Sequence, residues 1–364
     1  MGTPASQVRY TEYGIPIRNL WHMLLYAWNE ASIKTHWSLK EVEDAPTLDA
    51  LLASILAKLI QQRMRIGLGR SYVDHHQSVQ AIRGRINFPE SLRQRSFERG
   101  EAYCEFQQYS ANAPKNQIVR STLARLIQIG QFGHDHQKVE QLRHTLRQLV
   151  RSLDGIDLIE LNLDFIRRQS LGHNDNDYRL MLAICELVLQ RQMPMEDSGG
   201  HPVPVIDHDA LILYSVYERF VANFYRLHLK SHTVKAQSRL SWHAKYDNPH
   251  LPSMQPDLII QDNHSGEIIV LDTKFTAKSL IENEWGKEIF DSSHIYQLYA
   301  YLTSQKHVSG EHQKASGILL YPAVNHKLSE RIELQDHVIR IECVDLAGPW
   351  QDIERQLLSL ITIK

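Results

Sequence analysis

The segment PDLIIQDNHSGEIIVLDTKF, residues 256–275, contains two apolar runs separated by a polar turn near His264. This pattern predicts a β-hairpin. Asp257 stands at the outer end of the first strand, and Asp272 and Lys274 stand at the outer end of the second. A buried strand rarely carries charged side chains, because an unpaired buried charge is energetically costly. The charges at one end of this hairpin therefore indicate either a functional site or a structural ion pair.

The expected strand register brings these charges together. With the turn centred at His264, Asp257 faces Leu271 and lies beside Asp272. Residues paired across two strands lie within roughly 5 Å of each other. Asp272 and Lys274 are two positions apart and so share one face of their strand. We therefore expect two carboxylates and one ammonium group to converge at the open end of the hairpin.

Two neighbouring helices carry further candidates for this site. The helix predicted over residues 209–230 holds Glu218 at the edge of its apolar face, where a carboxylate requires a nearby cation. In the helix predicted over residues 293–306, Gln297 and Tyr301 are four positions apart and share one face. The candidate catalytic residues are therefore Glu218, Asp257, Asp272, Lys274, Gln297 and Tyr301.

Carboxylates that share a site repel one another unless a cation lies between them. Mg²⁺ suits such a site because it prefers oxygen ligands and retains several waters; Mn²⁺ is the alternative. A metal in this position lowers the pKa of a bound water and stabilises charge on a phosphate. Lys274 is placed to orient that water or to offset charge in the transition state. The combination predicts phosphodiester hydrolysis.

The alternative interpretation is a structural ion pair between Lys274 and one aspartate, which would cap the end of the hairpin. An isolated Asp-x-Lys triplet would favour that interpretation. The additional carboxylates, Asp257 and Glu218, and the shared face of Gln297 and Tyr301 favour a metal-dependent site.

The chain is long enough for two domains, since its 364 residues exceed what one core usually spans. Residues 192–209 contain three prolines and two glycines among acidic residues, a composition typical of a linker. We therefore expect an N-terminal mixed α+β domain over residues 1–200 and an α/β domain over residues 201–364.

Hydrophobic periodicity predicts the elements of both domains. In the N-terminal domain it predicts short β segments within residues 71–92, and helices over residues 15–30, 45–67, 116–132, 136–153 and 176–192. In the second domain it predicts β structure over residues 232–242, 256–275, 315–323 and 331–346, and a further helix over residues 350–363. This order of elements indicates one central sheet covered by helices.

The chain carries 40 Lys and Arg residues against 42 Asp and Glu, a formal net charge of −2. Contact with nucleic acid would therefore require a local patch or a partner. One local excess of positive charge exists between residues 60 and 100. This segment contains eight arginines and only three acidic residues, Asp74, Glu90 and Glu98. Arginine favours bidentate contacts to phosphate or carboxylate. A solvated surface is the alternative interpretation of this segment.

The expected location is the cytoplasm, with no membrane partner. No apolar run approaches the roughly 18 residues that a bilayer span requires. The N-terminal segment lacks the basic and apolar regions of a secretory signal. Cys104, Cys185 and Cys343 are far apart and odd in number, which argues against a disulfide framework and a cysteine zinc site.

The hairpin motifs resemble those of the PD-(D/E)xK nuclease superfamily: PD at 256–257, DTK at 272–274, and a glutamate on the preceding helix. QLYAY at 297–301 is similar to the Q-x-x-x-Y element of the RecB-like branch. The resemblance implies a restriction-endonuclease-like fold for the second domain. It also implies that Glu218, Asp257, Asp272 and the backbone carbonyl of Thr273 bind the metal, and that Lys274 is the catalytic lysine.

Further segments resemble McrC proteins, in the same order along the chain. They are IPIRNLWHMLLYAW near the start, IRGRINFPESL at 82–92, NAPKNQIVRSTLARLI at 112–127, VLDTKF, YQLYAYL and GILLYP. The resemblance implies the endonuclease subunit of a GTP-dependent restriction complex that is directed to methylcytosine. The implied partners are a hexameric McrB-type AAA+ GTPase, which this subunit binds and stimulates, and double-stranded DNA with modified cytosine.

GTP is expected only through that partner, because this chain has no G-x-x-x-x-G-K-[ST] phosphate loop. The N-terminal domain is then the partner-binding domain. Arg83 and Arg85, which flank Gly84, are expected to project into the partner ring. Two alternatives stay open: a stand-alone RecB-like DNA repair nuclease, and a non-catalytic activator of the GTPase ring.

Overall fold

The computed structural model describes residues 10–11, 13–28, 45–172, 175–191, 208–243, 248, 250–275, 280–282, 288–324 and 327–362. The chain forms two compact units: residues 45–196, and residues 1–44 together with 197–364. Residues 192–207 of the expected linker lie outside the described residues. The first 44 residues thus belong to the C-terminal unit, which differs from the expected division at residue 200.

Helix α1 (Ile17–Ala27) explains this difference, because it packs against helix α9 (His208–His228). The amide of Asn223 donates a hydrogen bond to the carbonyl of Ala27 at 2.9 Å. Asn19 is fully buried, and its amide donates to the carbonyl of Leu346 at 2.7 Å. Apolar periodicity predicts such a helix correctly, but it does not say which distant segment covers the apolar face.

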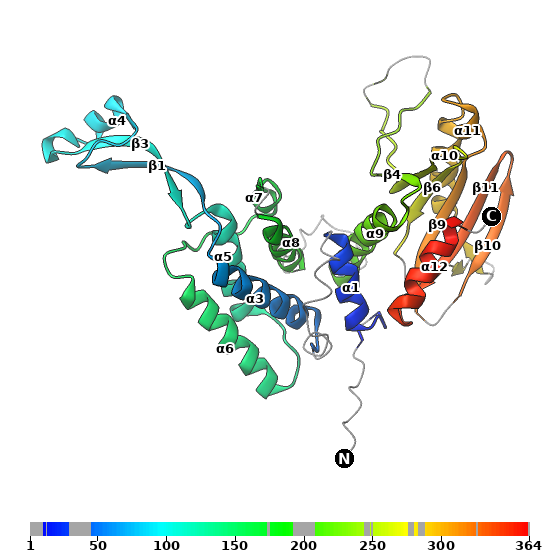
Figure 1. Cartoon of the computed structure of the whole chain (residues 1–364), viewed down its shortest axis with the longest axis horizontal. Helices are drawn as coiled ribbons and strands as arrows, with labels where there is room; N and C mark the ends of the chain where they lie inside the picture. Colours follow the sequence, from blue (N-terminus) through cyan, green and yellow to red (C-terminus); the bar gives the residue numbers. More distant parts are fainter. Residues whose placement is uncertain are drawn as a thin grey trace, which may run out of the picture. The chain divides into compact units, whose positions relative to one another are not determined.

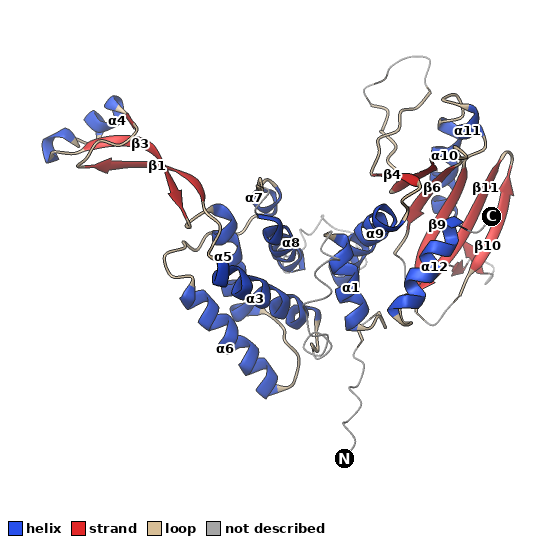
Figure 2. Cartoon of the chain, viewed as in Figure 1, coloured by secondary structure: helices blue, strands red, loops and turns tan. Residues whose placement is uncertain are grey.

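The C-terminal unit contains a six-stranded mixed sheet with the order β10-β11-β9-β6-β5-β4 (Figure 2). Strands β6, β9 and β11 are parallel to one another, and the other neighbouring pairs are antiparallel. The strands are β4 (His232–Ala236), β5 (Leu258–Asp262), β6 (Ile268–Thr273), β9 (Ser316–Ala323), β10 (Ser329–Leu334) and β11 (His337–Asp345). Every position of β6 is buried, as a central strand covered on both faces requires.

Helices cover both faces of this sheet (Figure 1). Helix α10 (Ser292–Ser304) packs on the face formed by Val270 and Leu319. A Cβ atom on Gly317 would lie 2.8 Å from Leu298 of α10, so glycine permits this close approach. The other face packs against α9 and α12 (Trp350–Thr362), which are joined by a hydrogen bond from the Tyr225 hydroxyl to the Leu357 carbonyl. The unit also contains α11 (Gly310–Gln313), β7 (Leu280–Glu282) and β8 (Glu288–Phe290).

The predicted hairpin is confirmed as β5 and β6, but its register differs from expectation by one position. Leu258 lies opposite Leu271, so the next residue outward, Asp257, comes opposite Asp272. The turn closes with a hydrogen bond from Asp262 N to the Glu267 carbonyl at 3.0 Å. Its centre therefore lies between His264 and Ser265 rather than at His264. The expectation that Asp257 faces Leu271 was wrong, and the two aspartates are closer partners than expected.

The second unit, residues 45–196, has a body of packed helices. These are α3 (Leu48–Ile66), α5 (Pro114–Ile129), α6 (His136–Ser152), α7 (Leu163–Arg167) and α8 (Asn176–Arg191). Buried polar groups join three of its segments: the Asn116 amide donates to the Gly69 carbonyl at 2.8 Å, and the Tyr178 hydroxyl accepts from Gly69 N at 3.0 Å. The chain leaves this body at Gly69 and enters strand β1.

Strands β1 (Ser71–Val79) and β3 (Ala102–Ser110) form a long antiparallel ribbon that extends from the helical body (Figure 1). We call residues 71–110 the arm. Its far end holds the short strand β2 (Arg85–Ile86), helix α4 (Phe88–Arg93) and a 3₁₀ turn (Phe97–Arg99). The β segments predicted within residues 71–92 are confirmed as β1 and β2, whereas β3 was not expected.

Among the described residues, no helix is long and apolar enough to cross a membrane.

Candidate functional site

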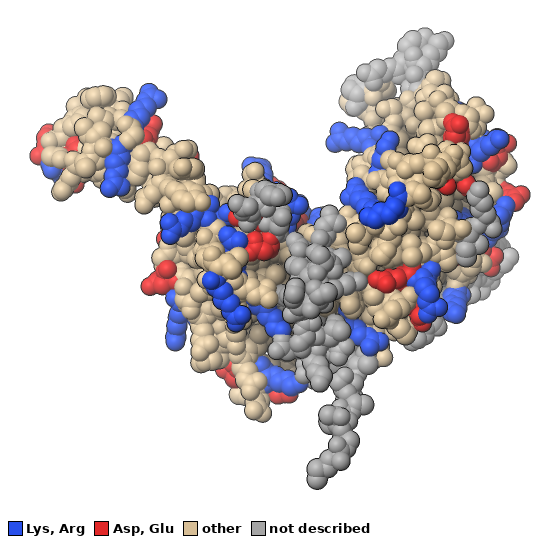
Figure 3. Space-filling view, viewed as in Figure 1, with Lys and Arg blue, Asp and Glu red and all other residues tan. Residues whose placement is uncertain are grey.

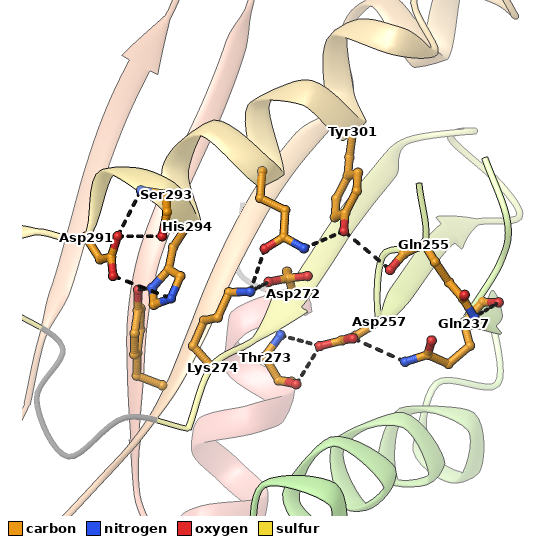
Figure 4. A network of polar contacts seen from close by, with 12 residues as sticks. Gln237, Gln255, Asp257, Asp272, Thr273, Lys274, Asp291, Ser293, His294 and Tyr301 are labelled. Carbon is orange, nitrogen blue, oxygen red and sulfur yellow. Dashed lines mark hydrogen bonds and ion pairs between the residues drawn. The ribbon is translucent and has the colours of Figure 1, made fainter. Parts of the chain in front are cut away.

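The charged residues of the hairpin meet at the end of the sheet, between α9 and α10 (Figure 4). Asp257 immediately precedes β5, Asp272 and Thr273 end β6, and Lys274 follows β6. Both aspartates are buried, with exposed fractions of 8% for Asp257 and 2% for Asp272. Because they occupy opposite positions on paired strands, their side chains belong to the same face of the sheet.

Hydrogen bonds fix the orientation of Asp257. Its Oδ2 atom accepts from the backbone nitrogen of Thr273 at 2.7 Å and from the Thr273 hydroxyl at 2.6 Å. Its Oδ1 atom accepts from the side-chain amide of Gln237 at 3.2 Å. Asp257 is therefore bound to the opposite strand through one oxygen and to the segment after β4 through the other. The metal-ligand role expected for the Thr273 carbonyl stays a prediction.

Lys274 is held between a carboxylate and an amide. Its Nζ atom lies 2.7 Å from Oδ2 of Asp272 and donates to Oε1 of Gln297 at 2.8 Å. The amide of Gln297 donates to the Tyr301 hydroxyl at 2.6 Å, which in turn lies 3.4 Å from the Gln255 carbonyl. The predicted shared face of Gln297 and Tyr301 is confirmed, and it is directed at the lysine (Figure 4).

Glu218 joins the same network from α9. The amide of Gln237 donates to Oε1 of Glu218 as well as to Asp257. The structure therefore brings together all the residues expected to form one catalytic site: Glu218, Asp257, Asp272, Lys274, Gln297 and Tyr301. Their proximity is an observation, while their catalytic roles stay predictions.

The site carries more negative charge than Lys274 offsets. Burial, followed by the negative charge of Asp257, raises the pKa of Asp272 to about 6, although Lys274 opposes this shift. Burial and the charge of Asp257 also raise the pKa of Glu218 to about 7. Tyr214, one helical turn before Glu218, has a raised pKa for the same reasons: burial first, then the charges of Asp257 and Glu218.

These donors fit a hard divalent cation. Mg²⁺ is typically bound by one or two carboxylates and completes its coordination with water, and the site offers two buried aspartates with Glu218 nearby. Within the described part of the chain, no group of three or more His, Cys, Asp or Glu side chains is arranged so that it could hold a metal ion, so side-chain binding of a metal here would rest chiefly on the two aspartates. The oxygen donors and the small number of side-chain ligands therefore suit Mg²⁺ or Mn²⁺ better than a structural zinc.

Sequence reasoning missed several residues of this network. Gln237 and Gln255 lie in irregular segments, where no periodic pattern identifies a site residue. Tyr214 could have been found from its spacing of four residues before Glu218. His294, on α10, bonds the Tyr321 hydroxyl at 2.8 Å, and burial and then the charge of Lys274 lower its pKa. His294 could have been identified from the sequence because it lies three residues before Gln297 and so shares its helix face.

The expected partner-binding residues lie on the arm, in the other unit. Arg83 and Arg85 are both exposed and flank Gly84, whose φ is +62°. A Cβ atom on Gly84 would lie 2.3 Å from the Glu105 carbonyl, so only glycine lets the chain cross the ribbon here. One arginine of the arginine-rich segment between residues 60 and 100 has a structural partner instead: Arg63 pairs with Asp177 at 3.4 Å within the helical body.

Comparisons with known proteins identify the family. A family model described as McrBC 5-methylcytosine restriction system component matches residues 8–322. The type IV methyl-directed restriction enzyme EcoKMcrBC of Escherichia coli (strain K12) is 28% identical to this chain over 351 residues. That match covers 95% of this chain and 97% of the relative.

Two solved assemblies from Thermococcus gammatolerans are also similar. One is a refined half-complex from a tetradecameric assembly of McrB AAA+ hexamers with bound McrC, at 18% identity and a TM-score of 0.49, covering 95% of this chain and 76% of that one. The other is a cryo-EM structure of the McrBC complex, at 18% identity and a TM-score of 0.36, covering 59% of each chain. Since the family model spans most of the sequence, this chain belongs to the McrBC 5-methylcytosine restriction system component family.

Proposed function

We propose that this chain is the endonuclease subunit of a GTP-dependent, methylcytosine-directed restriction complex, and that it hydrolyses DNA phosphodiesters with Mg²⁺, or Mn²⁺ in its place. The observation that carries the proposal is that the buried carboxylates of Asp257 and Asp272 lie together with the ammonium group of Lys274 at one end of the hairpin. A mixed sheet with this triplet at its strand ends, and helices on both faces, supports a PD-(D/E)xK restriction-endonuclease-like fold.

The residues divide the chemistry as follows. Asp257, Asp272, Glu218 and the Thr273 carbonyl would hold the metal, which supplies an activated water and offsets charge on the phosphate. Lys274 donates a hydrogen bond to the attacking water or to a non-bridging phosphate oxygen, where negative charge grows in the transition state. Gln297 and Tyr301 orient Lys274, because Gln297 bonds both of them.

A structural ion pair alone is a weaker explanation of this site. One lysine and one aspartate would be balanced in charge, yet here the pKa values of Asp272 and Glu218 are raised to about 6 and about 7. Burial of additional carboxylates lowers stability unless something compensates. A function that needs clustered carboxylates explains why they are present.

The proposed partner is a hexameric McrB-type AAA+ GTPase, and the proposed substrate is double-stranded DNA with modified cytosine, both in the cytoplasm. The family description names a component of a system, and the Escherichia coli relative is named a methyl-directed restriction enzyme. This sequence contains no phosphate loop of its own, so GTP hydrolysis requires a second chain.

The arm is the proposed partner-binding surface. Its far end exposes apolar side chains to an unusual degree: 64% for Ile82, 59% for Phe88 and 68% for Leu92. Clustered exposed apolar residues with a polar rim are typical of protein interaction sites. Arg83 and Arg85 lie beside them, and Figure 3 shows Lys and Arg side chains on the visible face of the arm.

Plasmid cleavage tests the proposed function. Methylated and unmethylated plasmids are incubated with this chain, with and without the partner GTPase, GTP and Mg²⁺. Double-strand cutting that requires methylation, partner, GTP and metal together is the expected result. Cutting by the chain alone would instead identify a stand-alone nuclease. Stimulated GTP turnover without cutting under any condition would identify a non-catalytic activator.

A further inference from the structure

Gln237, directly after strand β4, has an unusual backbone conformation. Its φ of +51° lies in the left-handed region, which side chains other than glycine and asparagine rarely adopt. Such conformations persist only where surrounding contacts impose them, and they are frequent at functional sites. The contacts that impose this one are all within the described network.

Both backbone groups of Gln237 are bound to the segment that leads into β5. Its nitrogen donates to the carbonyl of Asp257 at 2.9 Å. Its carbonyl accepts from the side-chain amide of Gln255 at 3.0 Å. The left-handed backbone is therefore locked from both sides, and it directs the side chain toward the carboxylates.

The side chain of Gln237 joins two carboxylates from different elements. Its Nε2 atom donates to Oε1 of Glu218, on α9, and to Oδ1 of Asp257, before β5, the latter at 3.2 Å. Only the amino end of a glutamine amide can donate, so two carboxylate acceptors determine its orientation. One amide thus sets the spacing between a helix residue and a strand residue.

We infer that Gln237 is a positioning residue that fixes the Glu218 side chain relative to Asp257 for the binding of one divalent cation. This inference rests on the proposed metal-dependent function of the site. Groups that hydrogen-bond the ligands of a metal orient them before the metal arrives, and their loss weakens binding even though they do not touch the metal. Without Gln237, Glu218 loses the hydrogen bond that ties it to Asp257.

The structure offers a matched control. Gln335, in the turn between β10 and β11, is also a glutamine in the left-handed region, with φ of +53°, and its side chain accepts a hydrogen bond from Tyr299. Gln237→Gly and Gln335→Gly each place glycine where the backbone favours it. The two substitutions therefore have the same backbone effect, while only the first removes the bridge between carboxylates.

The test is Mn²⁺ binding by titration calorimetry, on full-length wild type, Gln237→Gly, Gln335→Gly and Asp272→Asn. Gln237→Gly is expected to weaken Mn²⁺ binding on the order of tenfold or more, with Gln335→Gly unchanged. In plasmid cleavage, the metal concentration for half-maximal rate should rise by the same factor, and excess metal should restore most of the rate. Melting curves verify that each variant is folded. Should Gln237→Gly fail to fold, Gln237→Asn replaces it, since asparagine accepts a left-handed backbone but its shorter amide cannot span both carboxylates.

The outcomes separate this inference from the proposed function. Wild-type affinity in Gln237→Gly, combined with weakened binding in Asp272→Asn, would overturn the role of Gln237 alone. Equal weakening in Gln335→Gly would also overturn it, because the effect would then come from the backbone. Mn²⁺ binding that Asp272→Asn leaves unchanged would overturn both the inference and the proposed metal site.

Discussion

Two antiparallel ribbons of this chain, β5–β6 and β1–β3, differ in which side chains they bury and which they expose. The first is buried, and its charged residues are bonded to one another at one end, with Asp272 only 2% exposed. The second is exposed over much of its length, with Tyr72 and Tyr109 directly opposite each other and 70% and 57% exposed, and only its far end buries side chains such as Cys104. Under the proposed function, the buried charges of the first ribbon serve the reaction, and the exposed apolar side chains of the second bind the partner.

The two ribbons also obtain their stability differently. β5–β6 is stabilised by the helices on both faces of the sheet. An isolated two-stranded ribbon is marginal in water, so the arm needs local polar contacts instead. Asn87 donates to Glu105 at 2.7 Å, and the hydroxyls of Ser78 and Ser96 lie 2.7 Å apart. Substitutions at the charged end of the first ribbon should therefore affect the cleavage rate, and those at the far end of the second should affect binding of the partner.

Loss of the lysine ammonium should give the largest effect. Lys274→Met removes the only positive group bonded to Asp272 and Gln297 in the described network. Removing one such transition-state donor typically lowers the rate about 10²–10³-fold. Plasmid cleavage at saturating Mg²⁺ measures this, with the exposed Lys314→Met as the control. A cleavage rate within threefold of wild type would assign Lys274 a structural role only.

Loss of the arm arginines should give a smaller effect on a different readout. Arg83→Ala combined with Arg85→Ala should lower partner-stimulated GTP turnover by roughly tenfold, since contacts between exposed arginines and a partner are worth about 1–2 kcal/mol together. Mn²⁺ binding at the proposed nuclease site should be unchanged. The control is Arg167→Ala with Arg168→Ala, the last residue of α7 and the residue that follows it, in the same unit. Unchanged GTP turnover and partner affinity in the arm variant would exclude this role.

The metal-free site should make stability depend on pH. In the folded chain the pKa of Asp272 is about 6, while an unfolded aspartate titrates near its ordinary value of about 4. Between these values the folded state retains a proton that the unfolded state has lost, so the free energy of unfolding falls as pH rises. Glu218, with a pKa of about 7, acts in the same direction.

Melting curves in EDTA at pH 5 and pH 7.5 test this pH dependence. The wild-type melting temperature should fall from pH 5 to pH 7.5, and for Asp272→Asn this fall should be several degrees smaller. The size follows because 1 kcal/mol corresponds to roughly 2–4 °C in domains of this size. Mg²⁺ should raise the melting temperature more at pH 7.5, where the carboxylates are ionised. Parallel curves for wild type and Asp272→Asn would contradict the shifted pKa of Asp272.

The smallest effect is expected from the residue that orients the lysine. Gln297→Ala removes one hydrogen bond to Lys274 but leaves its ion pair with Asp272. A hydrogen bond to a charged group contributes about 1.5 kcal/mol at the low end, and since the ion pair still holds Lys274, cleavage should fall by roughly tenfold, less than in Lys274→Met. If Gln297→Ala were as inactive as Lys274→Met, the amide would have a direct role in the reaction.

The sequence predicted the buried ribbon better than the exposed one, for a physical reason. Residues 256–275 form two apolar runs separated by a polar turn, because a core covers both strands. A single sequence is enough to recognise that pattern. Strand β3 was missed because only its first positions, Ala102 and Cys104, are buried, so the alternation of buried and exposed residues does not extend along the strand. The two-domain division failed at α1, whose partner, α9, lies far along the chain.

The candidate site was predictable where spacing fixes geometry. Asp257, Asp272 and Lys274 follow from strand pairing, and Gln297 with Tyr301 follows from helical spacing. The one-residue error in register came from the turn, which Asp262 and Glu267 close, so that its centre falls between two residues rather than on His264. Gln237 was not predictable, since its role depends on a left-handed backbone and on tertiary contacts that no local pattern encodes.

We propose above that the buried aspartates bind a metal ion that this chain requires for DNA cleavage. The most direct measurement compares Asp272→Asn with Asp262→Asn, a substitution of the aspartate at the turn end of the same hairpin. Both are assayed for methylated-plasmid cleavage with partner, GTP and Mg²⁺, and for Mn²⁺ binding. Asp272→Asn is expected to lose cleavage and metal binding while remaining folded and partner-bound, and Asp262→Asn is expected to retain both. Normal cleavage by Asp272→Asn would contradict this proposal.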